Sequence, residues 1–188
     1  TGGMALACSV FLALGAPPLV AQDQGGEVQV SADVAAAGED LLSAEELDTL
    51  TAPVALFPDA LLAQVMMATT FPLDIVKADQ FLSDNAELTD KERAAAVEGN
   101  DWDPSVKALA AGFPDLIGRM ASHISWTEQM GDAVLAQTDD VFDSVQRLRV
   151  QAKSLGYLED NPAKATTESD EGELVISSKD PEVVYVPQ

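Results

Sequence analysis

Few residues in this chain have types that could do chemistry. His123 is the only histidine among 188 residues, so the chain cannot form a metal site that needs several imidazole ligands. An acid-base triad with a histidine would depend on this one side chain. It stands near the end of an apolar helical stretch, where histidine more often caps a helix than catalyses. The chain also has no glycine-rich phosphate loop, no serine elbow and no HExxH motif. We therefore predict no catalytic residue, no metal site and no cofactor.

The string NDWDPSVKAL contains the most distinctive arrangement of acidic residues. Asp101, Asp103 and Ser105 match the first three ligand positions of a calcium loop. However, Val106 stands where the sharp turn needs a glycine, and Gly112 stands where the loop needs a bidentate acid. The calcium interpretation therefore fails on the sequence.

A structural interpretation of the same string is favoured. Asp103 followed by Pro104 is typical of an N-cap and the first residue of a helix, and Trp102 would pack its ring between helices. The alternative is an acidic groove near Asp101, Trp102 and Asp103 that serves a hydrolase or a carbohydrate-binding protein. This alternative predicts that Asp101→Asn abolishes an activity and leaves the melting temperature unchanged.

The charge of the chain excludes one class of partner. Its 32 acidic and 10 basic residues give a net charge of -22, which repels phosphate backbones, so we expect no nucleic-acid partner. Most of this surplus is interpreted as a solvated surface, with weak cation binding as a third candidate function. Aromatic residues make up only 5% of the chain, and Trp102, Trp126 and Tyr185 are the candidates for contact with a partner, although packing is their commoner role.

Residues 1–21 have the composition of a signal peptide. An apolar run from Met4 to Leu14 is too short for a membrane span of about 20 residues, and it is followed by small residues that end at Ala21. Cleavage there would remove Cys8, the only cysteine, and with it any disulfide or thiol nucleophile. We expect an exported protein with no transmembrane span in its mature chain. Residues 22–42 predict an acidic, disordered linker.

Residues 43–158 carry repeated helix-start signals and predict a helical domain. Serine or threonine three residues before glutamate is typical of a capping box, as in SAEE. Proline suits the first position of a helix, and an acid beside it lies at the positive end of the helix dipole. The predicted cap and first-turn residues are Ser43, Pro58, Asp59, Pro72, Thr89, Asp103, Pro104, Pro114, Asp115 and Ser125.

The motif Phe-Pro-Asp occurs twice, from Phe57 and from Phe113, each time ahead of an apolar helical pattern that breaks after about a dozen residues. Each unit predicts a helical hairpin. Duplication of one unit and independent use of a good helix start are both compatible with two copies. The predicted fold class is all-α: a compact bundle of about six or seven helices, built from two helical hairpins, with a C-terminal β-hairpin.

The C-terminal part of the helical domain predicts one long helix over 126–155, which Gly131 could bend. Residues 159–172 are acidic and polar, and they predict a linker. Residues 173–188 contain the β-branched runs ELVIS and EVVYVP around a SKDP turn, and they predict a β-hairpin that is truncated at Gln188. A lone hairpin needs a third strand or a helix to cover it.

Four strings of this chain together resemble a bacterial exported family, domain of unknown function 3300 (DUF3300): LLSAEELDTLTAPVALFPDALLAQVMMATTFPLDIV, NDWDPSVKALAAGFPDLIGRM, SWTEQMGDAVLAQTDDVFDSVQRLR and VVYVP. The resemblance covers about residues 41–187. It implies an envelope protein of a Gram-negative-type bacterium, periplasmic or associated with the outer envelope. It implies no activity and no catalytic residues.

These observations favour a non-catalytic envelope module that binds a protein or a cell-wall component. The expected contact surface is the outer face of the stretch from Trp126 to Leu155, together with the edge of a strand over 182–187. The oligomeric state and the partner's identity stay open at this point.

Overall fold

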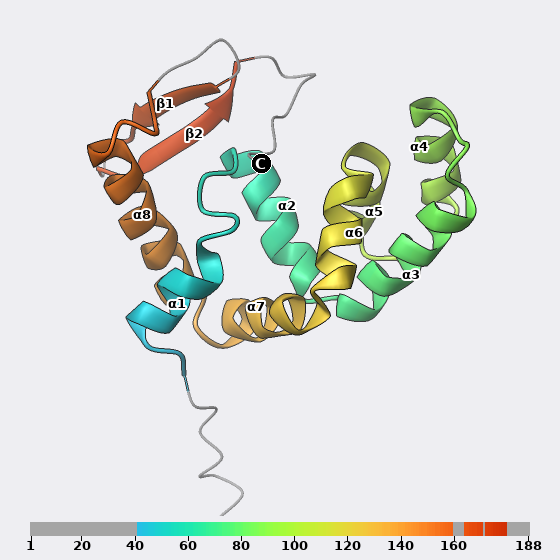
Figure 1. Ribbon diagram of the computed structural model, residues 1–188, viewed down its shortest axis with the longest axis horizontal. Helices are drawn as coiled ribbons and strands as arrows, with labels where there is room; N and C mark the ends of the chain where they lie inside the picture. The colour runs from blue at the N-terminus through green and yellow to red at the C-terminus, as the bar shows by residue number, and fades with distance from the viewer. Residues whose placement is uncertain (1–40, 160–163, 171, 180–188) are drawn as a thin grey trace, which may run out of the picture. The chain divides into compact units, whose positions relative to one another are not determined.

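The computed structural model describes residues 41–159, 164–170 and 172–179, all within the compact unit that begins at Gly38. These residues form eight α-helices and one two-stranded antiparallel sheet (Figure 1). The prediction of a mainly α fold with a small β-hairpin is confirmed, although the described residues contain eight helices rather than six or seven. The elements are α1 (Ala44–Thr51), α2 (Asp59–Thr69), α3 (Pro72–Asp84), α4 (Asp90–Glu98), α5 (Pro104–Gly112), α6 (Pro114–Ser122), α7 (Ile124–Ala136), α8 (Thr138–Ser154), β1 (Lys164–Glu168) and β2 (Leu174–Ser178).

Three predicted N-caps are confirmed. Glu46 N–H donates to the hydroxyl of Ser43 at 3.4 Å, and Ser43 N–H donates to the Glu46 carboxylate at 2.9 Å, which completes a capping box. Thr89 closes the same box at the start of α4. Asp103 accepts from Ser105 N–H at 2.8 Å and starts α5. These caps satisfy amide groups that the first turn of a helix leaves unpaired.

Two predicted helix starts need correction. Pro72, Pro104 and Pro114 occupy the first turn as expected, but Pro58 is the N-cap of α2, one residue before the helix. Ser125 is not a cap, because α7 begins at Ile124 and Ser125 already has helical backbone. An N-cap needs a non-helical backbone, and the short connector before α7 leaves that conformation only to His123.

Three connectors between consecutive helices consist of a single residue. They are Phe113, His123 and Gln137, which have φ between -147° and -113° and ψ between 47° and 59°. Phe71, just before α3, has similar angles, φ -123 and ψ 57. The predicted long helix over 126–155 is therefore wrong, since the chain turns at Gln137 between α7 and α8. The physical reason is tertiary: the Gln137 side-chain amide accepts from Leu42 N–H at 2.7 Å and donates to Leu42 C=O at 3.1 Å.

The two Phe-Pro-Asp strings have different surroundings. Phe113 and Pro114 join α5 directly to α6, whereas Phe57 and Pro58 close the loop between α1 and α2. Phe71 with Pro72 is the better structural counterpart of Phe113 with Pro114, because both pairs have the same connector geometry. The two strings therefore match in sequence and not in backbone context.

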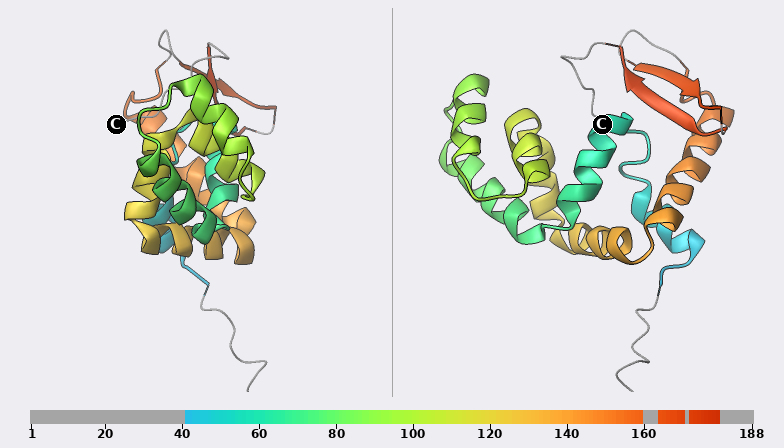
Figure 2. Two further views of the ribbon diagram at one scale, coloured as in Figure 1. Left: turned by 90° about the vertical axis from the view of Figure 1, so that its right-hand side faces the viewer. Right: turned by 180° about the vertical axis from the view of Figure 1, so that it is seen from behind.

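The helices of the two predicted hairpins interleave. The chain bends by 106° between α2 and α3, so these two helices pack on each other only near their junction. Instead, α2 packs against α5 and α7, and α3 packs against α6, as the two further views show (Figure 2). Side chains from six of the helices meet with no exposed surface in this core, which includes Val65, Ile75, Val106, Leu109, Ile117, Met130 and Val141.

No single helix among the described residues is both long and apolar enough to cross a bilayer. Together α2 and α3 reach the required length and composition, but the 106° bend separates them.

Gly131 allows α2 and α7 to approach closely. A Cβ atom at this position would overlap the carbonyl group of Thr69 at the end of α2. The interior of a helix normally favours alanine over glycine by about 0.5–1 kcal/mol. Packing overrides this preference here, because the carbonyl is backbone and has no rotamer to change.

We therefore expect Gly131→Ala to lower the free energy of unfolding by about 1–3 kcal/mol, since the added methyl group must push the two helices apart. Gly118→Ala, in the middle of α6, is the matched control, because its Cβ would lie at an ordinary 3.4 Å from an Asp79 carboxylate oxygen. That substitution should leave stability unchanged or raise it. Urea unfolding measures both, and equal effects of the two substitutions would contradict the packing argument.

The β-hairpin lies earlier in the chain than predicted. β2 contains the LVIS part of the ELVIS run, but its partner β1 lies within the predicted linker over 159–172, with Thr166 opposite Ile176. The linker interpretation of this segment is therefore wrong. Its adjacent threonines, Thr166 and Thr167, favour a strand, but the surrounding acids hid that signal. The EVVYVP run, which was expected to pair with ELVIS, lies outside the described residues.

Helices cover the hairpin, as a two-stranded sheet requires. The apolar side chains of Leu174 and Ile176 are buried against Ala152 and Leu158, with Leu56 beside them. Figure 1 shows the hairpin at the C-terminal end of α8. The sheet thus completes a second, smaller hydrophobic cluster.

Side chains of the helical part also bind the edge of β2 that faces away from β1. The Gln146 amide accepts from Leu174 N–H at 2.9 Å and donates to Leu174 C=O at 3.3 Å. Ile176 N–H donates to Asp59 at 3.5 Å. These side chains take the place that a third strand would occupy.

Arg149 of α8 is the largest fully buried side chain among the described residues. Its guanidinium donates to the carbonyl oxygens of Ala55 at 2.8 Å, Phe57 at 3.1 Å and Leu174 at 2.6 Å. It also pairs with the Asp59 carboxylate at 2.7 Å. One side chain thus joins α8, the loop between α1 and α2, the first turn of α2 and strand β2.

A second contact joins α1 to α8. The Arg147 guanidinium lies 2.6 Å from the Asp48 carboxylate, which also accepts from the Ser144 hydroxyl at 2.8 Å. The hydrogen bond from Arg147 is the largest influence on this group, and it lowers the pKa of Asp48 below its ordinary value of 3.8. A carboxyl with a lowered folded pKa adds stability above its ordinary pKa, and this stability is lost as the pH falls through the folded pKa.

We expect wild type to be more stable than Asp48→Asn by at most about 1 kcal/mol near neutral pH, because the pair is partly exposed and screened. This difference should shrink as the pH falls below about 5 and on through the lowered pKa of Asp48 in the folded protein, because asparagine is a fair mimic of the protonated carboxyl group. Urea unfolding across this range measures the effect. When Arg147→Gln is also present, the pH dependence of the stability difference between aspartate and asparagine at position 48 should disappear. If the difference between wild type and Asp48→Asn does not change with pH, the role given to the Asp48–Arg147 pair is contradicted.

Candidate functional site

Three neighbouring hollows lie along α7, beside α1 and the loop that follows it. We call them the apolar end, the central hollow and the far hollow. Trp126 lines both the apolar end and the central hollow, whereas Leu42 and Gln129 line both the central and the far hollow. We call the whole surface the α1–α7 groove. From His123 to Gln137 it follows α7 for about 20 Å, at about 1.5 Å per residue.

The apolar end has a volume of about 300 Å³. The loop after α1 and the helix α6 supply most of its lining, and Trp126 closes it on the side of α7. Its two polar side chains are Arg119, in the last turn of α6, and His123. Both are exposed. The remaining lining residues are Pro53, Val54, Phe57, Leu116 and Met120.

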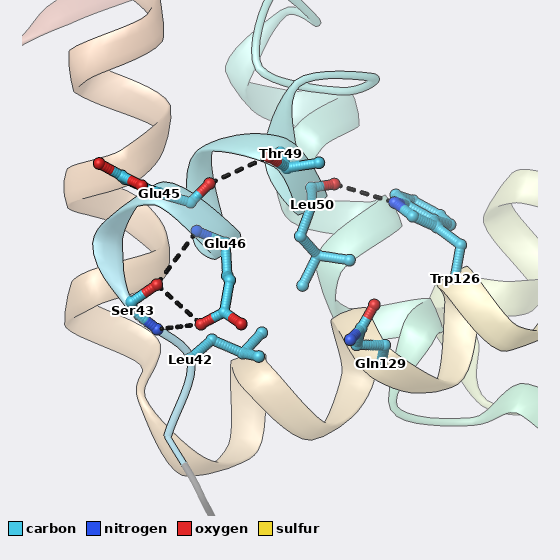
Figure 3. A pocket seen from close by; sticks show the side chains of 8 residues that line it. All are labelled: Leu42, Ser43, Glu45, Glu46, Thr49, Leu50, Trp126 and Gln129. Atoms are coloured by element: carbon cyan, nitrogen blue, oxygen red, sulfur yellow. Dashed lines mark hydrogen bonds between the residues drawn. The ribbon is translucent and has the colours of Figure 1, made fainter.

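The central hollow is more polar and has a volume of about 620 Å³. Figure 3 shows the α1 side chains on one side of it and Trp126 and Gln129 of α7 on the other. Its acidic lining residues are Glu45 and Glu46. The hydrogen bonds from Ser43 lower the pKa of Glu46, which therefore stays ionised at neutral pH.

The far hollow, of about 310 Å³, lies where the chain enters α1. Leu41 and Leu42 form one side of it, and Gln137 holds the Leu42 backbone in an extended strand-like contact. Leu41 is 60% exposed, although it is a large apolar residue. This end of the groove therefore also presents apolar surface to solvent.

Trp126 is the fixed wall between the apolar end and the central hollow. Its indole N–H donates to Leu50 C=O at 2.9 Å, and the ring is half-buried (Figure 3). Because this donor already has a partner, the exposed part of the ring can contribute only apolar contact. An aromatic ring held in one orientation loses little conformational entropy when a partner binds.

His123 has a structural partner on one ring nitrogen. Its Nδ1 lies 3.0 Å from Arg119 C=O and 3.1 Å from the Ser122 hydroxyl. This position at the junction of α6 and α7 agrees with the predicted capping role. Within the described residues, no group of three or more histidine, cysteine, aspartate and glutamate side chains is arranged to hold a metal ion.

Structural contacts account for most of the NDWDPS corner. The Trp102 ring meets the Phe81 ring edge to face, with the ring centres 5.6 Å apart. Asp103 caps α5, and its own N–H donates to Asp74 at 3.2 Å. Only Asp101 of the three predicted groove residues is exposed. The packing role predicted for Trp102 is thus seen, and the structure does not bring Trp102 together with Trp126 in one site.

Only part of α8, which was expected to bind a partner, is open to solvent, because other residues of this helix contact the β-hairpin. Gln146 and Arg149 hold the hairpin, as described above. Phe142 is 47% exposed and Val150 is 58% exposed, so both stay open to solvent. The other predicted contact residue, Tyr185, lies outside the described residues, as does the strand over 182–187.

The described residues thus form a mainly α domain with a small β-hairpin, and the comparisons place this domain in a family. The chain belongs to the family described as "Protein of unknown function (DUF3300)", which matches residues 43–188. The resemblance found in the sequence is confirmed. The chain is 47% identical over 116 residues to the "Uncharacterized protein YacH" of Escherichia coli (strain K12), a match that covers 62% of this chain and 19% of that protein. The chain therefore corresponds to about a fifth of that relative, and no solved structure matches it.

Sequence reasoning missed several residues of the groove. Arg119, Gln129 and Gln137 are ordinary helix residues by type and spacing, and only the tertiary fold brings them beside Trp126. One weak signal was available: the chain contains only four arginines, so each has a high chance of a specific contact in so acidic a protein.

Proposed function

We propose that this chain is a non-catalytic protein-interaction module of the bacterial cell envelope, and that it binds its partner in the α1–α7 groove. The observation that supports this proposal is the half-buried ring of Trp126, shared by two hollows and held by its bond to Leu50 C=O. Tryptophan is the residue type that most often dominates binding energy at protein interfaces. The groove is long and open rather than a closed cavity, which suits a chain more than a small substrate.

The envelope location is proposed from the sequence. Residues 1–21 have the pattern of a signal peptide, and the family resemblance points to exported proteins of Gram-negative-type bacteria. A partner met there is an envelope protein or a cell-wall component. We favour a protein, because the apolar end is lined mainly by aliphatic and aromatic side chains, whereas a sugar chain needs many polar partners.

The proposal is tested by photo-crosslinking in intact cells. A photoreactive phenylalanine analogue replaces Gln129, which is exposed and lines two hollows of the groove. We expect one discrete protein adduct that fractionates with the envelope. The matched control places the same group at Lys91, an exposed residue of α4 outside the groove. Equal labelling at both positions, or an adduct found only in the cytoplasm, would contradict the proposal.

A further inference from the structure

Arg119 differs from the other arginines of this protein. The guanidinium groups of Arg93, Arg147 and Arg149 each pair with an aspartate. Within the described part of the chain, the Arg119 guanidinium takes part in neither a hydrogen bond nor an ion pair, although the protein has a net charge of -22. An arginine without a carboxylate is therefore unexpected in this molecule, and it stands at the rim of the apolar end.

Resting on the proposed function, we infer that the α1–α7 groove binds an extended peptide segment of a partner protein, with an acidic side chain at Arg119 and apolar side chains beside Trp126. A guanidinium and a carboxylate form two parallel hydrogen bonds, and adjoining apolar walls strengthen them by excluding water. The peptide's acid thus supplies the partner that Arg119 lacks in the protein itself.

The dimensions of the groove fit an extended chain. At about 3.3 Å per residue, a segment of about six residues spans the length of α7 from His123 to Gln137. Alternate side chains of such a segment point to the same face, so two or three apolar groups can enter successive hollows. The apolar end, at about 300 Å³, is the right size for one large side chain.

The charges along the groove give the segment a polarity. Arg119 lies at one end, whereas Glu45 and Glu46 line the central hollow on the other side of Trp126. An acidic residue is therefore favoured only at the Arg119 end, and it is disfavoured beside α1. Asp115 lies one turn before Arg119 on α6, and no hydrogen bond or ion pair joins the two side chains. More distant acids contribute less, because charges beyond about 8 Å are largely screened at physiological ionic strength.

Fluorescence polarisation with labelled peptides tests this inference on the whole chain. The probe is acetyl-Glu-Leu-Val-Leu-Val-amide with a fluorophore at its C-terminal end, and its control has glutamine in place of glutamate. We expect the acidic peptide to bind about tenfold more tightly, which is a typical difference for one charge-assisted contact. Arg119→Gln should remove this difference and leave the affinity for the glutamine peptide unchanged. Lys91→Gln, which removes one exposed positive charge on α4, should change neither affinity.

Three results would overturn the inference: no binding of either peptide at millimolar concentration, equal binding of both, or a preference for the acid that survives Arg119→Gln. Arg119 and Lys91 are both exposed, so neither substitution should disturb the fold. Circular dichroism spectra and melting temperatures of the two variants check this. The proposed function is judged separately. If the crosslink at Gln129 forms equally well in the Arg119→Gln variant, the groove binds a partner but not through an acidic segment.

Discussion

The guanidinium of Arg149 is the contact on which most of this structure depends. It is 2% exposed, and it joins three backbone carbonyls and one carboxylate from parts of the chain that are far apart in sequence. Burying a charge is costly unless each of its donors finds a partner. Here each of the three guanidinium nitrogens has an acceptor, from the α1–α2 loop, α2 or β2. These segments therefore have to lie together if the charge is to be buried.

The candidate site depends on the same side chain. Arg149 binds the carbonyls of Ala55 and Phe57, and this loop also carries Pro53, Val54 and the Phe57 ring, which form one wall of the apolar end. On the opposite side, α7 is held near α2 by the close approach at Gly131 and near Leu42 by Gln137. The groove is thus fixed by contacts that lie behind it, and its exposed residues are left to meet a partner.

Glutamine side chains bind extended backbone at two places in this protein. Gln137 binds both polar groups of Leu42, and Gln146 binds both polar groups of Leu174. Each amide acts as a short β-strand does, because it offers one donor and one acceptor at the spacing of a peptide group. The Gln137 contact lies at the break between α7 and α8, and the Gln146 contact covers an edge of β2 with no third strand.

Local signals made much of the helical part predictable. The caps at Ser43, Thr89 and Asp103 and the prolines that start α3, α5 and α6 depend on nearby residues, which the sequence shows directly. The break at Gln137 was missed because it depends on Leu42, which is 95 residues away. Strand β1 was missed because its polar residues show no alternation with apolar ones, and its pairing depends on β2. The groove was only partly predicted: Trp126 was a candidate by type, but its neighbours Arg119 and Gln129 have no local pattern that marks them.

The most direct test of this account is the substitution Arg149→Lys, which keeps the positive charge and removes the planar guanidinium group with its fixed donors. We expect the free energy of unfolding to fall by about 3 kcal/mol, because several buried acceptors lose their donors. Native-state hydrogen exchange at the Leu174 and Ile176 amides should speed up at least about tenfold, since Arg149 holds β2 against the helices. Arg119→Lys, at an exposed arginine, is the control and should change neither quantity. A loss of stability below about 0.5 kcal/mol with unchanged protection of β2 would contradict the central role given to Arg149.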